Sequence, residues 1–168
     1  ALPEGAVLVR VRAGALNTID WFLAMGKPYF ARLMAGGGRR PRSHVVGVEF
    51  AGTGEAVGAN VTDFRPGDDV FGAARGSLTE YVAVPVERVV RKPVRVSFEQ
   101  AAGVPTAGLT ALQGLRKGGI ARGRRVLVNG ASGGIGTCAV QLATHFGAEV
   151  TGVCSTRNVD MVRSLGAA

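Results

Sequence analysis

The sequence has little of what would indicate a secreted, membrane-spanning or zinc-rich protein. Its 168 residues include two cysteines, Cys138 and Cys154, and both lie in apolar stretches. Two thiols form neither a disulfide framework nor a four-ligand zinc cluster, so a reducing compartment fits best. No apolar run approaches the roughly 20 residues needed to cross a bilayer, and the first residues lack the pattern of a secretory signal. We therefore expect a cytoplasmic protein without a membrane partner.

Acidic residues are also scarce. Twenty Lys and Arg stand against twelve Asp and Glu, which gives a formal charge of +8. This sign is compatible with nucleic acid, an anionic surface or an anionic cofactor. The one dense cluster, Arg39, Arg40 and Arg42, lies among glycines and a proline without interleaved aromatic residues, which favours a solvated loop over a nucleic-acid site. We therefore predict no nucleic-acid partner.

The first part of the chain has the pattern of short strands separated by glycine. Val7, Val9 and Val11 alternate with other residues at the period of a half-buried strand. Similar strands are predicted at 45–54, 69–72 and 78–84, with turn residues at Arg65-Pro66-Gly67-Asp68. A short helix is predicted from Thr18 to Met25. This half is therefore expected to be mostly β.

The pattern changes at Ser97, where Ser97-Phe98-Glu99-Gln100 matches a capping box and opens a helical stretch broken around Gly103-Val104-Pro105. We place a domain boundary here and predict domains at 1–96 and 97–168. Beyond it come a strand at 124–129, a helix that runs to Phe146 with Gly147 as C-cap, a strand at 149–154 and a helix at 158–165. This α/β order is the opening of a parallel doubly wound sheet.

The turn between the first strand and helix of this second half carries the strongest chemical signal. In NGASGGIG, the spacing of Ala131, Gly133 and Gly136 fits the dinucleotide fingerprint, with alanine in the first place. Gly133 leaves room for pyrophosphate, Gly136 permits close helix-to-strand packing, and the new helix offers free N–H groups to phosphate. The predicted cofactor-binding residues of the turn are Ala131, Ser132, Gly133, Gly134, Ile135 and Gly136. A purely structural glycine turn is the competing interpretation.

The end of the second strand indicates which dinucleotide is preferred. NAD enzymes usually place an acidic side chain there for the ribose hydroxyls, and Cys154-Ser155-Thr156-Arg157-Asn158 contains none. The hydroxyls of Ser155 and Thr156, the Asn158 amide and the permanent cation Arg157 instead form a set suited to the extra phosphate of NADPH, and Ser155, Thr156 and Arg157 are the predicted binding residues. A solvated role for Arg157 is the alternative. We therefore predict NADPH as the cofactor.

Two other protein families with a similar glycine-rich turn do not fit the rest of the sequence. A P-loop ends in Gly-Lys-Ser/Thr, whereas Thr137-Cys138 comes after Gly136 here. Short-chain dehydrogenases begin with a turn of this kind and carry Tyr-x-x-x-Lys, but here Tyr29 leads to Leu33 and Tyr81 to Pro85. Neither nucleotide hydrolysis nor short-chain dehydrogenase chemistry is expected.

Six ordered segments resemble the medium-chain dehydrogenase/reductase superfamily, and the likeness covers essentially the whole chain. They are ALNTIDWFLAMG, VGVEFAGTGEAVG, FRPGDDVFG, GSLTEYVAVP, FEQAAGVPTAGLTAL and VLVNGASGGIG. The chain is most similar to the zinc-independent quinone oxidoreductase (zeta-crystallin-like) branch. The resemblance implies a GroES-like β catalytic domain followed by a Rossmann domain, with a small-molecule substrate in the cleft between them and a homodimer for the full-length enzyme.

Zinc ligands are missing from the matching positions. Members with catalytic zinc carry a cysteine where this chain has Asn17, and Gly-His-Glu where it has Gly47-Val48-Glu49. His44 is the only nearby imidazole, and catalytic zinc needs three protein ligands. We therefore predict no metal site.

Without a Lewis acid, catalysis must rest on hydride placement in a dry cleft and on hydrogen bonds to the substrate carbonyl. By resemblance, Asn17 lies beside the nicotinamide and Thr110 contacts the cofactor. A helix cap for Asn17 and a buried helix hydroxyl for Thr110 are the alternatives. Phe22 stands where many quinone oxidoreductases carry a tyrosine, so Tyr29 is only a speculative proton donor and water is another.

Compared with the family, the sequence is expected to be truncated at both ends, because its first strand and the later Rossmann strands have no counterpart. We expect this piece alone to have weak or no activity and to expose apolar sheet edges. For the whole protein, we predict an NADPH-dependent reductase of quinones or α,β-unsaturated carbonyls. An enoyl-thioester reductase and a non-catalytic NADPH-binding or structural module are the alternatives.

Overall fold

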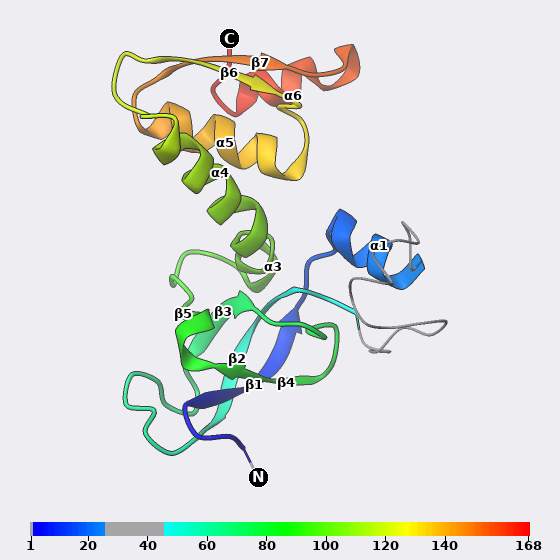
Figure 1. Cartoon of the computed structure of the whole chain (residues 1–168), viewed down its shortest axis with the longest axis vertical. Helices are drawn as coiled ribbons and strands as arrows, with labels where there is room; N and C mark the ends of the chain where they lie inside the picture. The colour runs from blue at the N-terminus through cyan, green and yellow to red at the C-terminus, as the bar shows by residue number, and fades with distance from the viewer. Residues whose placement is uncertain (1, 26–45) are drawn as a thin grey trace. The chain divides into compact units, whose positions relative to one another are not determined.

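The computed structural model describes residues 2–25 and 46–168 (Figure 1). The chain divides into two compact units, Ala1–Pro105 and Thr106–Ala168, called here the N-terminal and C-terminal units. The division falls later than the sequence-based boundary between residues 96 and 97. The reason is helix α3 (Phe98–Ala102), which packs against strands of the N-terminal unit and buries Ala101 and Ala102 there.

The N-terminal unit is built on an antiparallel sheet of five strands in the order β4-β1-β2-β3-β5. Helix α1 (Thr18–Met25) comes after the first strand and has the predicted bounds. The first four strands correspond to the predicted ones, and β5 was not predicted because three residues are too few to show alternation. The strands are β1 (Ala6–Ala13), β2 (Glu49–Val57), β3 (Asp69–Ala73), β4 (Tyr81–Pro85) and β5 (Val89–Arg91), with a 3-10 turn at Val86–Arg88.

Alternation along β1 explains how this sheet acquires its core. Val7 and Val9 are fully buried, whereas Arg10 and Arg12 are exposed. The buried valines pack with Phe50, Val70 and other apolar residues of the neighbouring strands. The turn before β3 is closed by the N–H of Asp68, which donates to the Arg65 carbonyl at 3.1 Å, and by the N–H of Arg65, which donates to the Asp68 carboxylate at 2.9 Å.

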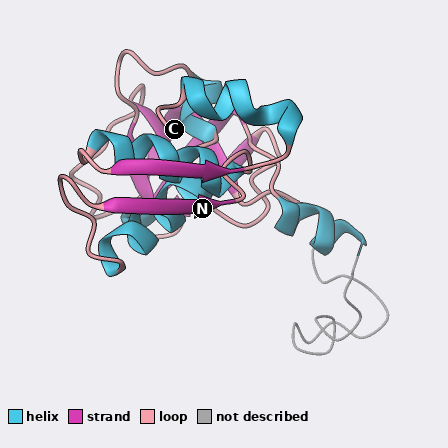
Figure 2. Cartoon of the chain, turned by 90° about the horizontal axis from the view of Figure 1, so that it is seen from above, coloured by secondary structure: helices cyan, strands magenta, loops and turns pink. Residues whose placement is uncertain are grey.

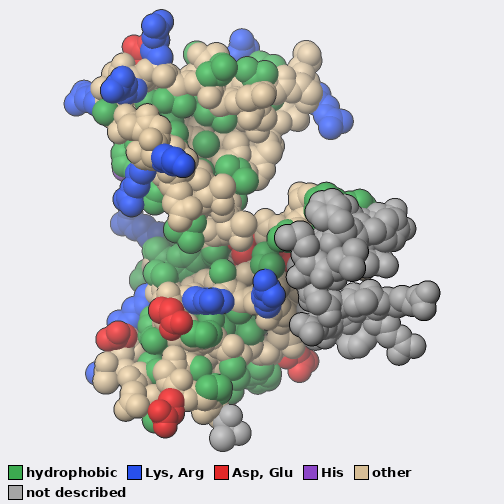
Figure 3. All heavy atoms as spheres, in the orientation of Figure 1, with side chains coloured by type: hydrophobic (Ala, Val, Ile, Leu, Met, Phe, Trp, Pro, Cys, Tyr) green, Lys and Arg blue, Asp and Glu red, His purple; other side chains and the backbone are tan. Residues whose placement is uncertain are grey.

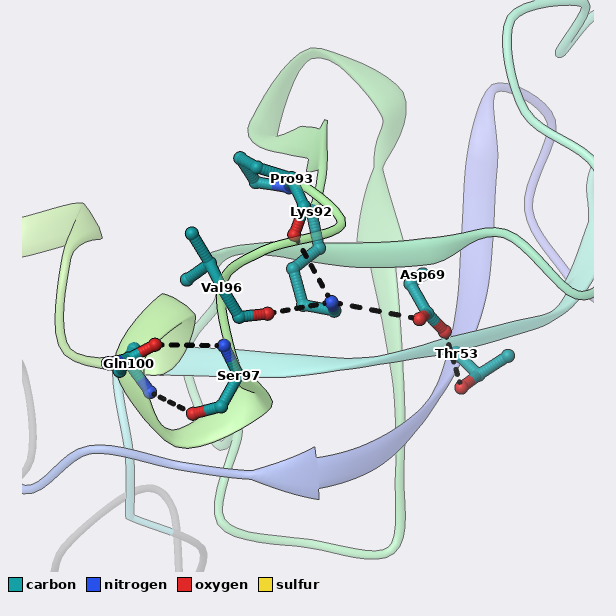
Figure 4. Close-up of polar contacts among 7 residues, drawn as sticks. All are labelled: Thr53, Asp69, Lys92, Pro93, Val96, Ser97 and Gln100. Carbon is teal, nitrogen blue, oxygen red and sulfur yellow. Dashed lines mark hydrogen bonds and ion pairs between the residues drawn. The ribbon is translucent and has the colours of Figure 1, made fainter.

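A lysine joins the sheet to the segment that leads into α3 (Figure 4). The Lys92 side chain is only 7% exposed, and its ammonium donates to the carbonyls of Val96 at 2.8 Å and Pro93 at 3.3 Å. The same ammonium lies 3.8 Å from the Asp69 carboxylate and 4.9 Å from the centroid of the Phe98 ring. Lys92 therefore holds the turn that precedes the helix.

The predicted capping box at the start of α3 is present. The Ser97 hydroxyl accepts from the N–H of Gln100 at 3.2 Å, and the Gln100 side chain accepts from the N–H of Ser97 at 3.0 Å (Figure 4). Two backbone donors at the helix start thus have side-chain acceptors. The expected break then comes at Gly103, and α4 (Pro105–Lys117) begins at the proline, a residue suited to a first helical position.

The C-terminal unit has the predicted β-α-β-α order. Strands β6 (Arg125–Asn129) and β7 (Glu149–Val153) pair in parallel, and Figure 2 draws them as two neighbouring arrows that point the same way. Helix α5 (Gly134–His145) connects them, and a 3-10 turn (Thr156–Asn158) leads into α6 (Val159–Ser164). Gly147 takes a φ of +77° after α5, as a left-handed C-terminal glycine does.

Only one face of this two-stranded sheet is covered within its own unit. Val128 and Val150 pack with Val140, Ala143 and Val162 of the helices. Leu127, which points to the opposite face, is 68% exposed. Figure 3 shows blue Lys and Arg side chains with little red on the drawn face of this unit, in keeping with the basic composition. Within the described residues, no helix has the length and apolar character needed to cross a membrane.

Candidate cofactor site

The glycine-rich turn begins where β6 ends and is anchored to the end of β7. Gly130 takes a φ of +78°, which favours glycine. The N–H groups of Gly130 and Ala131 both donate to the Val153 carbonyl, at 3.0 and 2.9 Å, and the N–H of Gly133 donates to the Gly130 carbonyl at 2.9 Å. The carboxyl ends of the two parallel strands and the start of α5 therefore form one structural element.

Gly136 brings α5 against this turn with no room for a side chain. A Cβ added at Gly136 would lie 2.1 Å from the Gly130 carbonyl oxygen and 2.9 Å from the Ala131 Cα. A Cβ added at Gly134, two residues earlier, would have no neighbouring atom within 4 Å. The close helix-to-strand packing inferred from the sequence thus falls on Gly136, while Gly133 and Gly134 are exposed.

The start of α5 presents backbone donors at this exposed surface. The first hydrogen bond of helix α5 runs from the N–H of Thr137 to the carbonyl of Gly133, at 2.8 Å. The N–H groups of Gly134, Ile135 and Gly136 come before it, and helix beginnings leave such donors without an intrahelical acceptor. Gly133 is the N-cap and offers no side chain to them. Together with the helix dipole, these donors favour a bound anion.

The end of β7 adds hydroxyls and one cation next to this turn. Ser155, Thr156 and Arg157 are all exposed, and the first acidic residue after β7 is Asp160 in α6. The N–H of Asn158 donates to the Ser155 carbonyl at 2.9 Å, which closes the short 3-10 turn. The predicted second-strand residues therefore lie on the surface, where a ligand could reach them.

Asn158 links the two predicted parts of the site. The sequence analysis counted its amide in the polar set after the second strand but did not name it as a binding residue. Its Nδ2 atom donates to the hydroxyl oxygens of Ser132 and Ser155, each at 3.1 Å. The structure thus connects Ser132 of the glycine-rich turn with Ser155 after β7. The sequence shows an amide in a segment without acidic residues. It does not show that this amide contacts Ser132.

Thr110 lies beside the glycine-rich element within the same unit. A cavity of about 560 Å³ runs along β6, and its lining includes Thr110, Asn129 and Ile135. Thr110 is exposed, and its hydroxyl donates to the Thr106 carbonyl at 2.6 Å, which leaves the oxygen able to accept a further hydrogen bond. In this chain the Thr110 hydroxyl is thus an exposed helix hydroxyl, and its contact with the cofactor stays a prediction.

The remaining catalytic candidate, Asn17, belongs to a polar cluster in the N-terminal unit. The Asn17 amide donates to the carboxylate of Glu49, which is 1% exposed. The Asp20 carboxylate, 2% exposed, accepts from the N–H of Asn17 at 2.8 Å and from the N–H of Gly47 at 3.1 Å. Asn17 precedes α1, but Asp20, and not the Asn17 side chain, satisfies a donor at this helix start.

The structure describes only one of the other residues that the sequence singled out near this site, Phe22. Tyr29 and His44 lie outside the described residues. Phe22 is exposed on α1, and its ring makes an edge contact with Trp21 at 5.1 Å between centroids. In residues 2–25 and 46–168, no group of three or more His, Cys, Asp or Glu side chains could hold a metal ion.

Comparison with known proteins matches residues 3–94 to the alcohol dehydrogenase GroES-like domain. The chain belongs to this family. It is 36% identical over 99% of its length to the chloroplastic NADPH-dependent alkenal/one oxidoreductase of Arabidopsis thaliana, 44% of which it spans. The relatives that it matches are medium-chain dehydrogenase/reductase proteins, named as quinone oxidoreductases, alkenal/one oxidoreductases and enoyl reductases.

Two solved structures extend the likeness to both units. The quinone oxidoreductase of Coxiella burnetii matches 99% of this chain with a TM-score of 0.86 and 34% identity, and 54% of it is covered. The CurK enoyl reductase matches 99% of the chain with a TM-score of 0.89 and 35% identity, and 51% of it is covered. The chain thus spans about half the length of the relatives it matches, and it has the GroES-like and Rossmann order inferred from the sequence.

Proposed function

We propose that the complete protein that carries this sequence is an NADPH-dependent, zinc-independent oxidoreductase that transfers hydride to a quinone or an α,β-unsaturated carbonyl. The observation that carries the proposal is the surface formed by the start of α5 and the end of β7. It combines free helical N–H groups with the side chains of Ser132, Ser155 and Arg157, and it has no acidic side chain between residues 154 and 158. This set suits a dinucleotide with an extra phosphate.

The local shape fits such a cofactor. The absence of a side chain at Gly133 and Gly134 leaves the backbone at the turn exposed, and Gly136 keeps α5 close enough for its N–H groups to face the same surface. Arg157 would provide a permanent charge and planar donors for a phosphate. The name of the Arabidopsis relative, an NADPH-dependent oxidoreductase, supports the same choice of cofactor.

When bound, the reduced nicotinamide supplies the hydride. The residues of this chain would bind and orient the cofactor: the α5 N–H groups and Ser132 would hold pyrophosphate oxygens, and Ser155 and Arg157 would hold the extra phosphate. Thr110 is proposed to contact the cofactor, and Asn17 to lie beside the nicotinamide with its amide oriented by Glu49. Conjugated acceptors suit this chemistry because they accept hydride at an electron-poor carbon without a metal. A homodimeric state for the complete protein stays a prediction.

The proposal is tested by NADPH oxidation in the complete polypeptide, with one quinone and one enone as acceptors and with zinc chelated. We expect turnover of at least one acceptor with NADPH that chelation does not reduce. Activity with NADH alone, or activity lost on chelation, would overturn the proposal. Saturable NADPH binding without turnover of any acceptor would favour a non-catalytic binding module instead.

The choice of cofactor has its own test in Arg157. Arg157→Ala should weaken NADPH binding by about 1.5 to 3 kcal/mol and spare NADH, because a charge-assisted contact is lost only with the extra phosphate. Arg163→Ala is the matched control, since Arg163 is also exposed and lies further along α6. An equal loss for both cofactors would contradict the role of Arg157.

An enoyl-thioester reductase is the second candidate, and the likeness to the CurK enoyl reductase supports it. The two activities share hydride transfer to a conjugated carbonyl, so the residues described above would act in the same way. A short enoyl thioester added to the same assay separates them. A kcat/KM for the thioester well above that for the quinone and the enone would favour the second candidate.

A further inference from the structure

Asn158 stands at a position where its side chain would ordinarily stabilise a helix. It is the N-cap of α6, and asparagine is among the best N-cap residues because its side-chain oxygen accepts a backbone N–H. Here the side chain makes no cap hydrogen bond. It turns instead to Ser132 and Ser155 and donates to both hydroxyl oxygens at 3.1 Å. The Asn158 amide thus contacts both the glycine-rich turn and the segment after β7.

These two hydrogen bonds determine what the serine hydroxyls can do. A hydroxyl has one proton to donate and two lone pairs that accept. Because each serine oxygen accepts a hydrogen bond from the Asn158 amide, each hydroxyl proton stays available for another acceptor. Ser132 is half-buried beside the helix start and Ser155 is exposed. Both hydroxyls are therefore set to donate to a ligand oxygen at the surface.

We infer that Asn158 is a positioning residue for NADPH: its amide directs the hydroxyl protons of Ser132 and Ser155 toward the phosphate oxygens of the cofactor. The inference rests on the proposed function. Ser155 lies in the acid-free segment after β7, so the part of the effect that passes through Ser155 acts on the extra phosphate and favours NADPH over NADH. Asn158 itself need not touch the cofactor.

The first test is Asn158→Asp in the complete polypeptide, with binding of NADPH and NADH measured by nicotinamide fluorescence without any acceptor. The carboxylate has the shape of the amide but accepts from both hydroxyls, so their protons no longer face a phosphate. We expect NADPH binding to weaken about tenfold or more, since hydrogen bonds to charged groups are strong. NADH binding should weaken clearly less, because only the part of the effect that passes through Ser132 acts on the pyrophosphate that both cofactors share. Asn60→Asp, at an exposed turn of the N-terminal unit, is the charge control and should change neither affinity.

A second test separates hydroxyl orientation from simple repulsion by the new charge. Asn158→Ala, Ser155→Ala and the double variant form a cycle in which no charge is added. If Asn158 acts through Ser155, the NADPH loss in the double variant should be clearly smaller than the product of the two single losses. Independent, multiplying losses would overturn the inference, as would an equal loss of NADPH and NADH in Asn158→Asp. If the unaltered protein binds neither cofactor, the proposed function itself fails.

Discussion

Gly136 is the residue of the glycine-rich turn whose replacement should destabilise the C-terminal unit most. In Gly136→Ala, the new Cβ would lie 2.1 Å from the Gly130 carbonyl oxygen, and its other near neighbours at 2.9 Å are also backbone atoms, the carbonyl carbon and Cα of Ala131. No rotation of a side chain can relieve these contacts. Helix α5 and the turn must therefore move apart by about 1 Å to reach the 3.0 Å below which real Cβ contacts essentially do not occur.

The hydrogen bonds around the turn set the size of the effect. The Gly130 carbonyl that the new Cβ meets also accepts the N–H of Gly133, and the N–H groups of Gly130 and Ala131 donate to Val153. Overpacking of a tight contact costs about 1–3 kcal/mol, and the loss of one such hydrogen bond adds about 1 kcal/mol. We expect Gly136→Ala to lower the free energy of unfolding by about 2–4 kcal/mol.

Gly134→Ala provides the matched control, because the same methyl group there meets nothing within 4 Å. Alanine is also the better helix former, by up to about 1 kcal/mol relative to glycine. Urea denaturation followed by far-UV circular dichroism would compare the two variants, while the fluorescence of Trp21, the single tryptophan, reports on the N-terminal unit. If Gly136→Ala proved as stable as Gly134→Ala, the close approach of α5 to the turn would be refuted.

Two further predictions concern the segment that leads into α3. Lys92→Met should lower the free energy of unfolding by about 1–3 kcal/mol, because two backbone carbonyls lose a buried donor; thermal unfolding would measure this, and the exposed Lys117→Met should change stability by no more than about 0.5 kcal/mol. Similar effects of the two changes would contradict the role of Lys92. For pH, a backbone hydrogen bond and a hydrogen bond with the Ser97 side chain hold the pKa of Glu99 below its ordinary value of 4.5. The ionised carboxylate therefore stabilises the fold above pH 4.5 and loses this effect as the pH falls through the lowered pKa. Unfolding midpoints should thus be higher for the unaltered protein than for Glu99→Gln at pH 7 and should converge below pH 4.5, whereas a constant difference would contradict the shift.

The elements that the sequence predicted best are those whose signals are local. The valine alternation of β1, the capping box at Ser97 and the left-handed Gly147 each depend on neighbouring residues, and the structure contains all three. Strand β5 was missed because three residues carry no periodicity. The end of the first compact unit at Pro105 depends on α3 packing against distant strands, which no local signal in the sequence shows.

The candidate site shows the same separation between local and distant signals. Gly136 is predicted by a spacing rule, and its close contact with the turn is visible in the structure. The contact of Asn158 with Ser132 joins residues 26 positions apart. Nothing in the spacing of these two residues predicts it, because it arises only when β6 and β7 pair in parallel and bring their carboxyl ends together. The roles assigned to the site residues in cofactor binding stay predictions.

The cluster around Asn17 gives the zinc-independent proposal a physical basis beyond missing ligands. By resemblance, Asn17 and Glu49 stand at positions that belong to the metal site of zinc-dependent members. Buried carboxylates are costly unless they are paired or hydrogen-bonded. Here Glu49 accepts from the Asn17 amide, and Asp20 accepts from the N–H groups of Asn17 and Gly47. Both carboxylates thus accept hydrogen bonds from neutral N–H groups, and asparagine in place of cysteine supplies a donor where a zinc site requires a thiolate.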